Sequence, residues 1–330
     1  MKTTRKTFKF KIYENPKKNR EFHWQLKIAN EIHNHCIALH KRYFKLFKKY
    51  LNANKLKNHL TKLRNLPENV HWKELGSQVI QDVAERIDRG YKAFFKKKGK
   101  NRGTPKFKKR ENQRSFTLKQ AGWKLISPNK IQINKTTFGF HKSREIQGII
   151  KTVTIKKDSC GSFWIFFSCD KVPLIQIKEC RTLKTAAFDF GLKTFLTCSE
   201  GACHNIKSPE FFKKSLKEIK STSKSLSTKK KGSQHRKAAK LSLAKIHRRV
   251  ANKRLDFFFK TSRHLIQTYD QIGFEDLNLT GMKKLWGSKI SDLAFGTFLA
   301  TLGNLAVGQK DFEIIKCGRF EKTTGVCLSI

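Results

Sequence analysis

Two acidic residues in this sequence follow apolar stretches, where a carboxylate is well placed to hold a cation. Asp189 follows the apolar run 186–188, and Glu275 follows the run 272–274 and precedes Asp276. A carboxylate among apolar neighbours costs several kcal/mol unless a cation or hydrogen bonds hold it. Each acid taken alone is equally compatible with a solvated residue at the end of a strand. Together they predict a pair of metal ligands.

The metal that suits such a pair is a hard divalent cation such as Mg²⁺, whose preferred ligands are oxygens. In a two-metal nuclease, carboxylates from neighbouring strands hold two Mg²⁺ ions, of which one activates a water and the other stabilises the leaving oxygen. The distance between Asp189 and Glu275 along the chain is no obstacle, because acids far apart in sequence meet at adjacent strand ends. The two residues therefore indicate a nuclease site of the RNase H type.

The charge of the chain supports a nucleic-acid partner. Lys and Arg number 72 against 25 Asp and Glu, which leaves a net charge of +47 on 330 residues. This excess repels itself in a compact fold unless a polyanion neutralises it, and phosphate backbones are the commonest polyanions in a cell. A free-standing metabolic enzyme is therefore disfavoured. The 27 Phe and 38% hydrophobic residues also exclude a disordered basic tail.

Two segments concentrate the basic residues. Glycines and a proline interrupt residues 96–114, which predicts a loop. Residues 213–263 contain 18 Lys and Arg against two acids; within them we expect a flexible stretch at 220–233 and an amphipathic basic helix at 235–264. Pairs within one helix cannot neutralise this excess, so we expect phosphate contacts rather than a merely solvated face. The residues expected to contact a nucleic-acid backbone are Lys106, Lys108, Lys109, Arg110, Arg248, Arg249, Lys253 and Arg254.

The hydrophobic pattern predicts an α+β protein with several domains. Alternating apolar residues predict a strand at 6–13, and helical spacings predict a helical unit at 16–98. Short β-rich runs follow between residues 116 and 170. We expect the first strand to join them in a small barrel, with the helical unit inserted between. After residue 183, strands alternate with helices.

Neither a membrane span nor a secretory signal is expected. The longest apolar runs are far shorter than the roughly 20 residues that a span requires, and the N-terminal residues include no apolar signal core. We therefore expect a cytoplasmic protein without a membrane partner. The eight cysteines include no Cys-x-x-Cys pair, and we expect the first seven to be buried reduced thiols. A zinc site at Cys198, Cys203 and His204 is a weak alternative, because it offers no fourth ligand.

Four ordered motifs resemble the RuvC-type domain of TnpB (OrfB) proteins, which bacterial insertion sequences encode and which are relatives of type V CRISPR effector nucleases. They are FDFGLKTFLT at 188–197, KIHRRVANKRLDFFFKTSRHLI at 245–266, FEDLNLTGMKK at 274–284 and SKISDLAFGTF at 288–298. The stretch GYKAFFKKKGKNRGTPKFKKRENQRSFTL at 90–118 is similar to the same family. The resemblance extends over nearly the whole chain, and four motifs in order are far more specific than one.

This resemblance implies a transposon-associated, RNA-guided, Mg²⁺-dependent DNA endonuclease. Its partners would be DNA and a guide RNA from the transposon end, with a partner transposase as a further candidate. Asp189 matches the first catalytic acid of the family and Glu275 the second. Residues 1–15 and 100–178 would form a wedge-like β-barrel, residues 16–99 a helical recognition lobe, and residues 181–330 a RuvC-like domain of the RNase H-like α/β class.

The C-terminal residues depart from the family pattern. There the last RuvC strand leads into a zinc ribbon with paired cysteines and then into a helix with a third catalytic Asp. Here Cys327 stands where the first zinc cysteine is expected, and one cysteine cannot complete a four-coordinate site.

We therefore expect a C-terminally truncated, incomplete RuvC-like domain without zinc ribbon or final helix, no bound zinc, and impaired cleavage. Whether the chain is an enzyme stays open at this point. The alternatives are a non-cleaving RNA-guided DNA-binding protein and a non-functional gene remnant.

Overall fold

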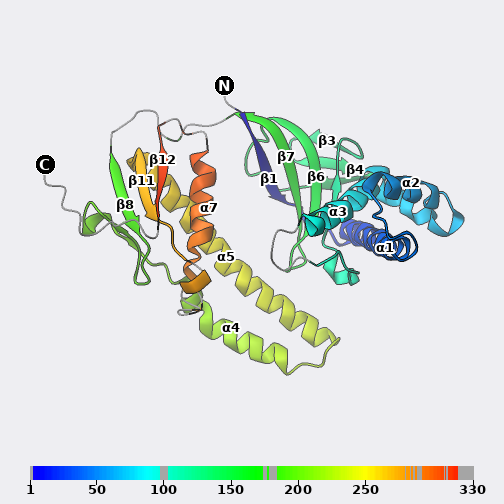
Figure 1. The fold of residues 1–330 in the computed structure, drawn as a ribbon. Helices are drawn as coiled ribbons and strands as arrows, with labels where there is room; N and C mark the ends of the chain where they lie inside the picture. Colours follow the sequence, from blue (N-terminus) through cyan, green and yellow to red (C-terminus); the bar gives the residue numbers. More distant parts are fainter. Residues whose placement is uncertain are drawn as a thin grey trace. The chain divides into compact units, whose positions relative to one another are not determined.

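The protein, described here from a computed structural model, contains two compact units, residues 3–173 and residues 174–330 (Figure 1). The structure describes residues 3–96, 103–173, 177, 184–278, 280–282, 284, 287, 292–307, 309 and 311–318. Both units combine helices and strands, which confirms the prediction of a multi-domain α+β protein. Each unit is considered by itself below.

The first unit is built on two antiparallel sheets. A four-stranded sheet has the order β1-β7-β6-β2, and a three-stranded sheet has the order β3-β4-β5. Strand β1 pairs with β7, so the predicted pairing of the first strand with later strands is confirmed. An isolated bridge between Ile12 and Phe140 adds a backbone link between the segments that follow β1 and β5. The strands are β1 (Thr3–Lys11), β2 (Ser115–Leu118), β3 (Trp123–Ser127), β4 (Lys130–Ile133), β5 (Thr136–Gly139), β6 (Ile149–Lys157) and β7 (Phe163–Pro173).

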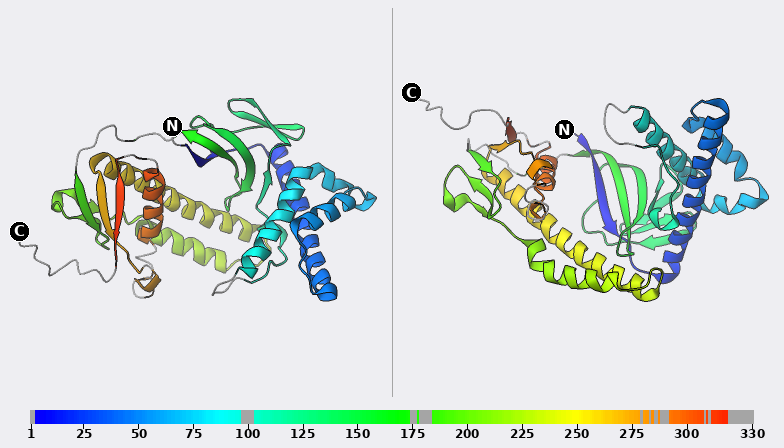
Figure 2. Two further views of the ribbon diagram at one scale, coloured as in Figure 1. Left: turned by 45° about the horizontal axis from the view of Figure 1, so that its top comes forward. Right: turned by 60° about the horizontal axis from the view of Figure 1, so that its bottom comes forward.

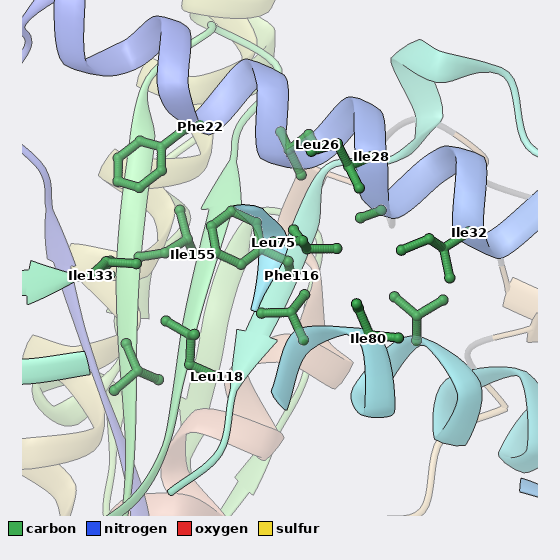
Figure 3. Close-up of a cluster of buried hydrophobic side chains, with 14 of the residues drawn as sticks. Phe22, Leu26, Ile28, Ile32, Leu75, Ile80, Phe116, Leu118, Ile133 and Ile155 are labelled. Atoms are coloured by element: carbon green, nitrogen blue, oxygen red, sulfur yellow. The ribbon is translucent and has the colours of Figure 1, made fainter. Parts of the chain in front are cut away.

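Helices occupy the segment between β1 and β2. They are α1 (Pro16–Phe47), α2 (Ala53–Leu63) and α3 (Ser77–Phe95), with 3₁₀ helices η1 (Pro67–Leu75) and η2 (Arg110–Asn112). Helix α1 begins at Pro16 because the side chain of Asn15 accepts a hydrogen bond from the Lys18 N–H and proline fits the first helical position. The apolar sides of the helices pack on the sheets. Figure 3 labels Phe22, Leu26, Ile28, Ile32, Leu75, Ile80, Phe116, Leu118, Ile133 and Ile155 of this core.

The second unit contains one five-stranded sheet with the order β10-β9-β8-β11-β12. Strand β11 runs parallel to both β8 and β12, and β9 runs antiparallel to β8. The strands are β8 (Thr185–Asp189), β9 (Thr194–Cys198), β10 (Ile206–Lys207), β11 (Gln271–Glu275) and β12 (Glu313–Cys317). The helices are α4 (Phe211–Ser227), α5 (Gln234–Thr268) and α7 (Phe295–Ala306), with the short η3 (Ala202–His204).

Helices α5 and α7 cover one face of this sheet (Figure 1). Phe188 and Phe274 point to that face, where they join Phe258 and Phe298 in the core. The predicted basic helix is confirmed as α5. The predicted flexibility of 220–233 is wrong for 220–227, because these residues form the end of α4, which packs along α5 (Figure 2).

Candidate functional site

Asp189 and Glu275 lie at the carboxyl ends of two neighbouring parallel strands. In the pairing of β8 with β11, Phe188 lies opposite Phe274. The next residue of each strand is the acid, so Asp189 and Glu275 follow paired residues of adjacent strands, and adjacent strands lie about 4.8 Å apart. The structure thus brings together the two acids that sequence reasoning singled out. Their catalytic role stays a prediction.

The surroundings of the two acids differ from the expectation. Both side chains are exposed, whereas Phe188 and Phe274 are buried. Successive strand residues point to opposite faces, so the apolar neighbours of each acid face the helices and the acid faces solvent. The predicted apolar surroundings of the two carboxylates are therefore wrong, and burial does not force them to hold a cation. The two acids remain candidate metal ligands because they lie beside each other on the open face of the sheet.

The two acids line a hollow of about 400 Å³ on this open face. Thr197 of β9 lies opposite Asp189, and Cys317 of β12 lies opposite Glu275. Ala187 and Gly273 line the same hollow. Because these two residues have almost no side chain, a bulky ligand can approach the sheet beside the carboxylates.

Two carboxylates suit Mg²⁺, which is usually held in proteins by one or two carboxylates together with waters and phosphate oxygens of a substrate. Among the described residues, no group of three or more His, Cys, Asp or Glu is arranged to hold a metal ion. The donor set therefore fits a Mg²⁺ ion shared with a phosphate-containing substrate. The described part of the chain adds no third carboxylate to the pair.

The predicted basic segment at 106–110 lies along helix α1. Asn34 forms a reciprocal pair with the backbone of Lys108: its side-chain amide donates to the carbonyl at 2.9 Å and its oxygen accepts from the N–H at 2.8 Å. Asn30 donates to the same carbonyl at 3.1 Å, and His33 lies 3.2 Å from the Lys106 carbonyl. Burial lowers the pKa of His33 to about 4, so its ring is neutral at pH 7.

The four cations predicted on this segment are all exposed, but the surroundings of Lys108 differ from those of the others. The pKa of Lys108 is nevertheless lowered, first by partial desolvation of its ammonium group and then by the neighbouring Arg86. Lys106, Lys109 and Arg110 are thus the better placed of the four to meet a phosphate.

The four cations predicted on α5 also differ. Arg254 is mostly buried and its guanidinium lies 3.1 Å from the carboxylate of Asp292. Arg249 is exposed and lies 3.4 Å from Glu218 of α4. Lys253 is exposed, and Arg248 is half-buried. A phosphate would have to displace Asp292 to reach Arg254, whereas Lys253 is directly accessible.

Asp292 is a residue to which sequence reasoning gave no role. Its carboxylate accepts hydrogen bonds from the backbone N–H groups of Phe212 at 3.0 Å and Lys213 at 3.2 Å, at the beginning of α4. It also pairs with Arg254 of α5. Asp292 therefore fixes the beginning of α4 against α5. The signal available in the sequence was an isolated acid within an otherwise apolar stretch, but its partners lie about 40 and 80 residues away.

The cysteines follow the prediction in part. Cys36, Cys160, Cys169 and Cys198 are buried free thiols, as predicted, and burial raises the pKa of Cys36 to about 12. Cys203 is exposed and Cys317 is half-buried, so the prediction of burial was wrong for these two. Cys203 lies in the short helix η3, and Cys317 lines the hollow on the open face of the sheet. Cys180 and Cys327 lie outside the described residues.

None of the helices in the described part of the chain is both long enough and apolar enough to cross a bilayer.

Comparisons with known proteins show similarity to one transposase family model and to several curated proteins. The family model OrfB_IS605, described as "Probable transposase", matches residues 170–285, a range that includes both Asp189 and Glu275. The "Putative RNA-guided DNA endonuclease InsQ" of Escherichia coli (strain K12) is 25% identical over 286 residues, which cover 86% of this chain and 69% of that protein. A Streptomyces pristinaespiralis protein with the same description apart from the name InsQ is 24% identical over 68% of this chain and 55% of its own length.

A third relative and one solved structure are also similar to this chain. TnpB-like protein L79 of Acanthamoeba polyphaga mimivirus is 29% identical over 177 residues, 49% of this chain and 34% of that protein. The Cas12f1 chain in a cryo-EM structure of the Cas12f1-sgRNA-target DNA complex aligns over 96% of this chain and 89% of its own, with a TM-score of 0.54 and 13% identity. At that identity the likeness concerns the fold alone.

Proposed function

We propose that this chain, which is similar in sequence to TnpB-like proteins, binds a guide RNA and DNA, and that it hydrolyses DNA phosphodiester bonds at the Asp189–Glu275 pair. One observation carries the proposal. Asp189 and Glu275 follow paired residues at the ends of parallel strands, and both line a hollow on the open face of the sheet, together with the small residues Ala187 and Gly273. That arrangement suits a phosphate backbone and a divalent cation at the same time.

Asp189 and Glu275 would hold Mg²⁺, which when bound activates a water and stabilises the oxygen that leaves. The protein contributes position. Phe188 and Phe274 anchor the two strands to the core with ring centroids 5.9 Å apart, so the acids that follow them are held in fixed register. Ala187 and Gly273 leave the approach to the acids open.

We assign nucleic-acid binding to two basic surfaces, one in each unit. In the first unit, Lys106, Lys109 and Arg110 are exposed on a segment that hydrogen bonds hold against α1. In the second unit, Arg249 and Lys253 are exposed on α5. Contacts of this kind position a backbone without selecting a sequence, so base pairing with the guide RNA would supply the specificity.

The domain assignment follows from the same resemblance. The sheets of residues 3–173 would be the wedge-like barrel, the helices between β1 and β2 the recognition lobe, and the sheet with α4, α5 and α7 the RuvC-like nuclease domain. The family match over residues 170–285 supports the last assignment.

A non-cleaving RNA-guided DNA-binding protein is the second candidate. It is favoured by the count of carboxylates, because the described residues bring only two of them together and a two-metal site uses a further bridging ligand. Such a protein would occupy its target without cutting it.

The test is a plasmid-cleavage assay in Mg²⁺, with protein and RNA from the flanking transposon end produced together. Asp189→Asn and Glu275→Gln remove one charge each without changing side-chain size. Glu313→Gln removes an exposed charge at the other end of the neighbouring strand β12 and is the matched control. We expect cleavage at least about a hundredfold slower in the first two variants and unchanged in the control.

Each other result has a distinct meaning. Cleavage that survives in both site variants would show that the chemistry lies elsewhere. Tight binding of the target without any cutting would select the second candidate. Failure of the full chain to bind either nucleic acid would contradict both proposals.

A further inference from the structure

Phe107 is an aromatic ring in the middle of the basic segment, and it faces solvent. Its side chain is 53% exposed, although a phenyl ring in water forgoes the free energy of burial. Its sequence neighbours Lys106, Lys108 and Lys109 are all cations. An exposed aromatic ring between cations is typical of surfaces that stack on the bases of single-stranded nucleic acids.

The ring stands on a fixed support. Asn34 and Asn30 bind the backbone of Lys108, and His33 binds that of Lys106, so the residues on both sides of Phe107 are tied to α1. The segment also contacts α3: a Cβ added to Gly90 would lie only 2.9 Å from the Pro105 side chain. Because the backbone is held from two helices, little conformational entropy remains to be lost when a ligand stacks on the ring.

One face of the ring is occupied by a cation. The Lys41 ammonium lies 4.5 Å from the centroid of the Phe107 ring. The exposed half of the side chain leaves the ring open to a second planar partner. Further along α1 lies Phe44, which is 59% exposed. Directly after the helix lies Lys48, whose ammonium is 5.9 Å from the Phe44 ring. The surface formed by Lys41, Phe44, Lys48, Lys106 and Phe107 thus alternates rings and cations.

The charge of this surface decides between two kinds of partner. An apolar protein surface would bury the ammonium groups beside the rings at a large desolvation cost. A single-stranded nucleic acid offers phosphates to the ammonium groups and planar bases to the rings at the same time. Duplex DNA offers phosphates alone, because its bases are already stacked.

Resting on the proposed binding of nucleic acid, we propose that Phe107 is a stacking site for an unpaired base of a single-stranded nucleic acid, with Lys41, Lys106 and Lys109 holding the adjacent phosphates. The base belongs either to RNA or to a displaced DNA strand, and both offer the same ring and phosphate.

The test measures binding of the full chain to a fluorescently labelled oligonucleotide of about 12 residues, a length within the range that such surfaces cover. Single-stranded RNA, single-stranded DNA, a duplex and an abasic strand of the same length are compared. Phe107→Ala removes the ring, and Phe107→Trp keeps a stacking surface. Phe95→Ala is the matched control, because Phe95 is a comparably exposed ring (59%) that packs on Tyr50.

We expect Phe107→Ala to weaken binding of a single strand about tenfold. Phe107→Trp should retain the affinity, and Phe95→Ala should bind as the unchanged protein does. The unchanged protein should bind the abasic strand about tenfold more weakly, and Phe107→Ala should add no further loss on that strand, because base and ring act as a pair. Whichever of the two single strands, RNA or DNA, binds with the higher affinity identifies the source of the base.

The abasic strand keeps the test independent of any effect of substitution on folding. Equal binding of the natural and abasic strands would overturn the proposal while leaving the proposed function intact. A change in self-association of Phe107→Ala without a change in affinity would make the ring a protein contact and would also overturn it. Absence of binding to every nucleic acid by the unchanged protein would instead contradict the proposed function itself.

Discussion

At the scale of single residues, the candidate site depends on the alternation of side chains along β8 and β11. Phe188 and Phe274 turn to the core, so Asp189 and Glu275 turn to solvent beside each other. Two like charges on adjacent strands repel, which costs some stability. A cation bound by both carboxylates would remove that cost, so binding of the proposed Mg²⁺ should stabilise the fold.

This leads to a prediction about metal removal. In EDTA, Asp189→Asn should unfold at the same temperature as the unchanged protein or slightly above it, because one repelling charge is gone. The free energy of unfolding should rise by a few tenths of a kcal/mol at most. Addition of Mg²⁺ should raise the melting temperature of the unchanged protein and leave that of the variant nearly constant. Scanning calorimetry with and without Mg²⁺ measures both. An equal Mg²⁺ shift in the two proteins would place the ion elsewhere.

Two buried histidines, His33 and His40, should make the free energy of unfolding depend on pH. Burial lowers the pKa of His33 and of His40 to about 4, against about 6.5 in the unfolded chain. Because the unfolded state binds protons first, the free energy of unfolding should be constant above pH 6.5 and fall as the pH drops from 6.5 to 4. The loss should approach about 3 kcal/mol per histidine. Urea titrations along this pH range test it.

A variant separates the histidines from the carboxylates that also titrate in acid. His33→Gln can still donate a hydrogen bond to the Lys106 carbonyl, and it carries no titratable group. Its stability should fall less steeply between pH 6.5 and 4 than that of the unchanged protein. An identical slope would mean that His33 is protonated in the folded state.

At the scale of elements, Asn34 joins the basic segment to α1. Asn34→Ala removes two hydrogen bonds to the Lys108 backbone, each contributing about 1 kcal/mol. The segment lies on the surface, so we expect its local opening to increase while global stability changes little. Trypsin should cut at the lysines of 106–110 faster in this variant. Asn54→Ala, an exposed asparagine on α2, should leave the rate unchanged.

Asp292 has a comparable role between α4 and α5. Asp292→Ala removes both acceptors for the first N–H groups of α4 and leaves the mostly buried Arg254 without its carboxylate. Loss of one partner of such a buried pair destabilises by about 3 kcal/mol or more. Asp256→Ala breaks only an exposed pair with Lys260, and it should cost less than about 0.5 kcal/mol. Urea unfolding compares the two. Equal effects would show that Asp292 does not hold α4.

At the scale of the whole molecule, the two units have separate hydrophobic cores. One core uses residues between Phe8 and Val172, and the other uses residues between Ala186 and Leu302. A core of its own is what a segment needs in order to fold alone. Exposed cations lie on both units, so the proposed binding of nucleic acid involves both of them.

We therefore predict that residues 3–173 fold when produced alone. Urea unfolding followed by circular dichroism and by tryptophan fluorescence should give one cooperative transition with the same midpoint for both probes. The fragment should also bind single-stranded nucleic acid, with an affinity that falls steeply as salt increases. A gradual unfolding curve without a transition would show that the first unit depends on the second.

Much of the fold followed from the sequence because its signals are local. Period-two alternation located β1, and helical spacing of apolar residues located α1, α3 and the basic helix α5. Charge counted over segments indicated the basic surfaces. Helix α4 was not predicted, and its second half was expected to be flexible. Its few apolar residues give a weak period, and its stability comes from packing on α5 and from the Asp292 carboxylate at its beginning.

The sequence by itself determined most of the strands and helices, that the chain is basic, and that Asp189 and Glu275 are the acids to examine. Only the tertiary structure decided that the two acids are solvent-exposed neighbours, that Asp292 holds α4 and α5 together, and that Phe107 is exposed on a segment fixed against α1. The reason is physical. Periodicity and composition depend on residues a few positions apart, whereas strand register, ion pairs and exposure depend on residues tens of positions away that folding brings into contact.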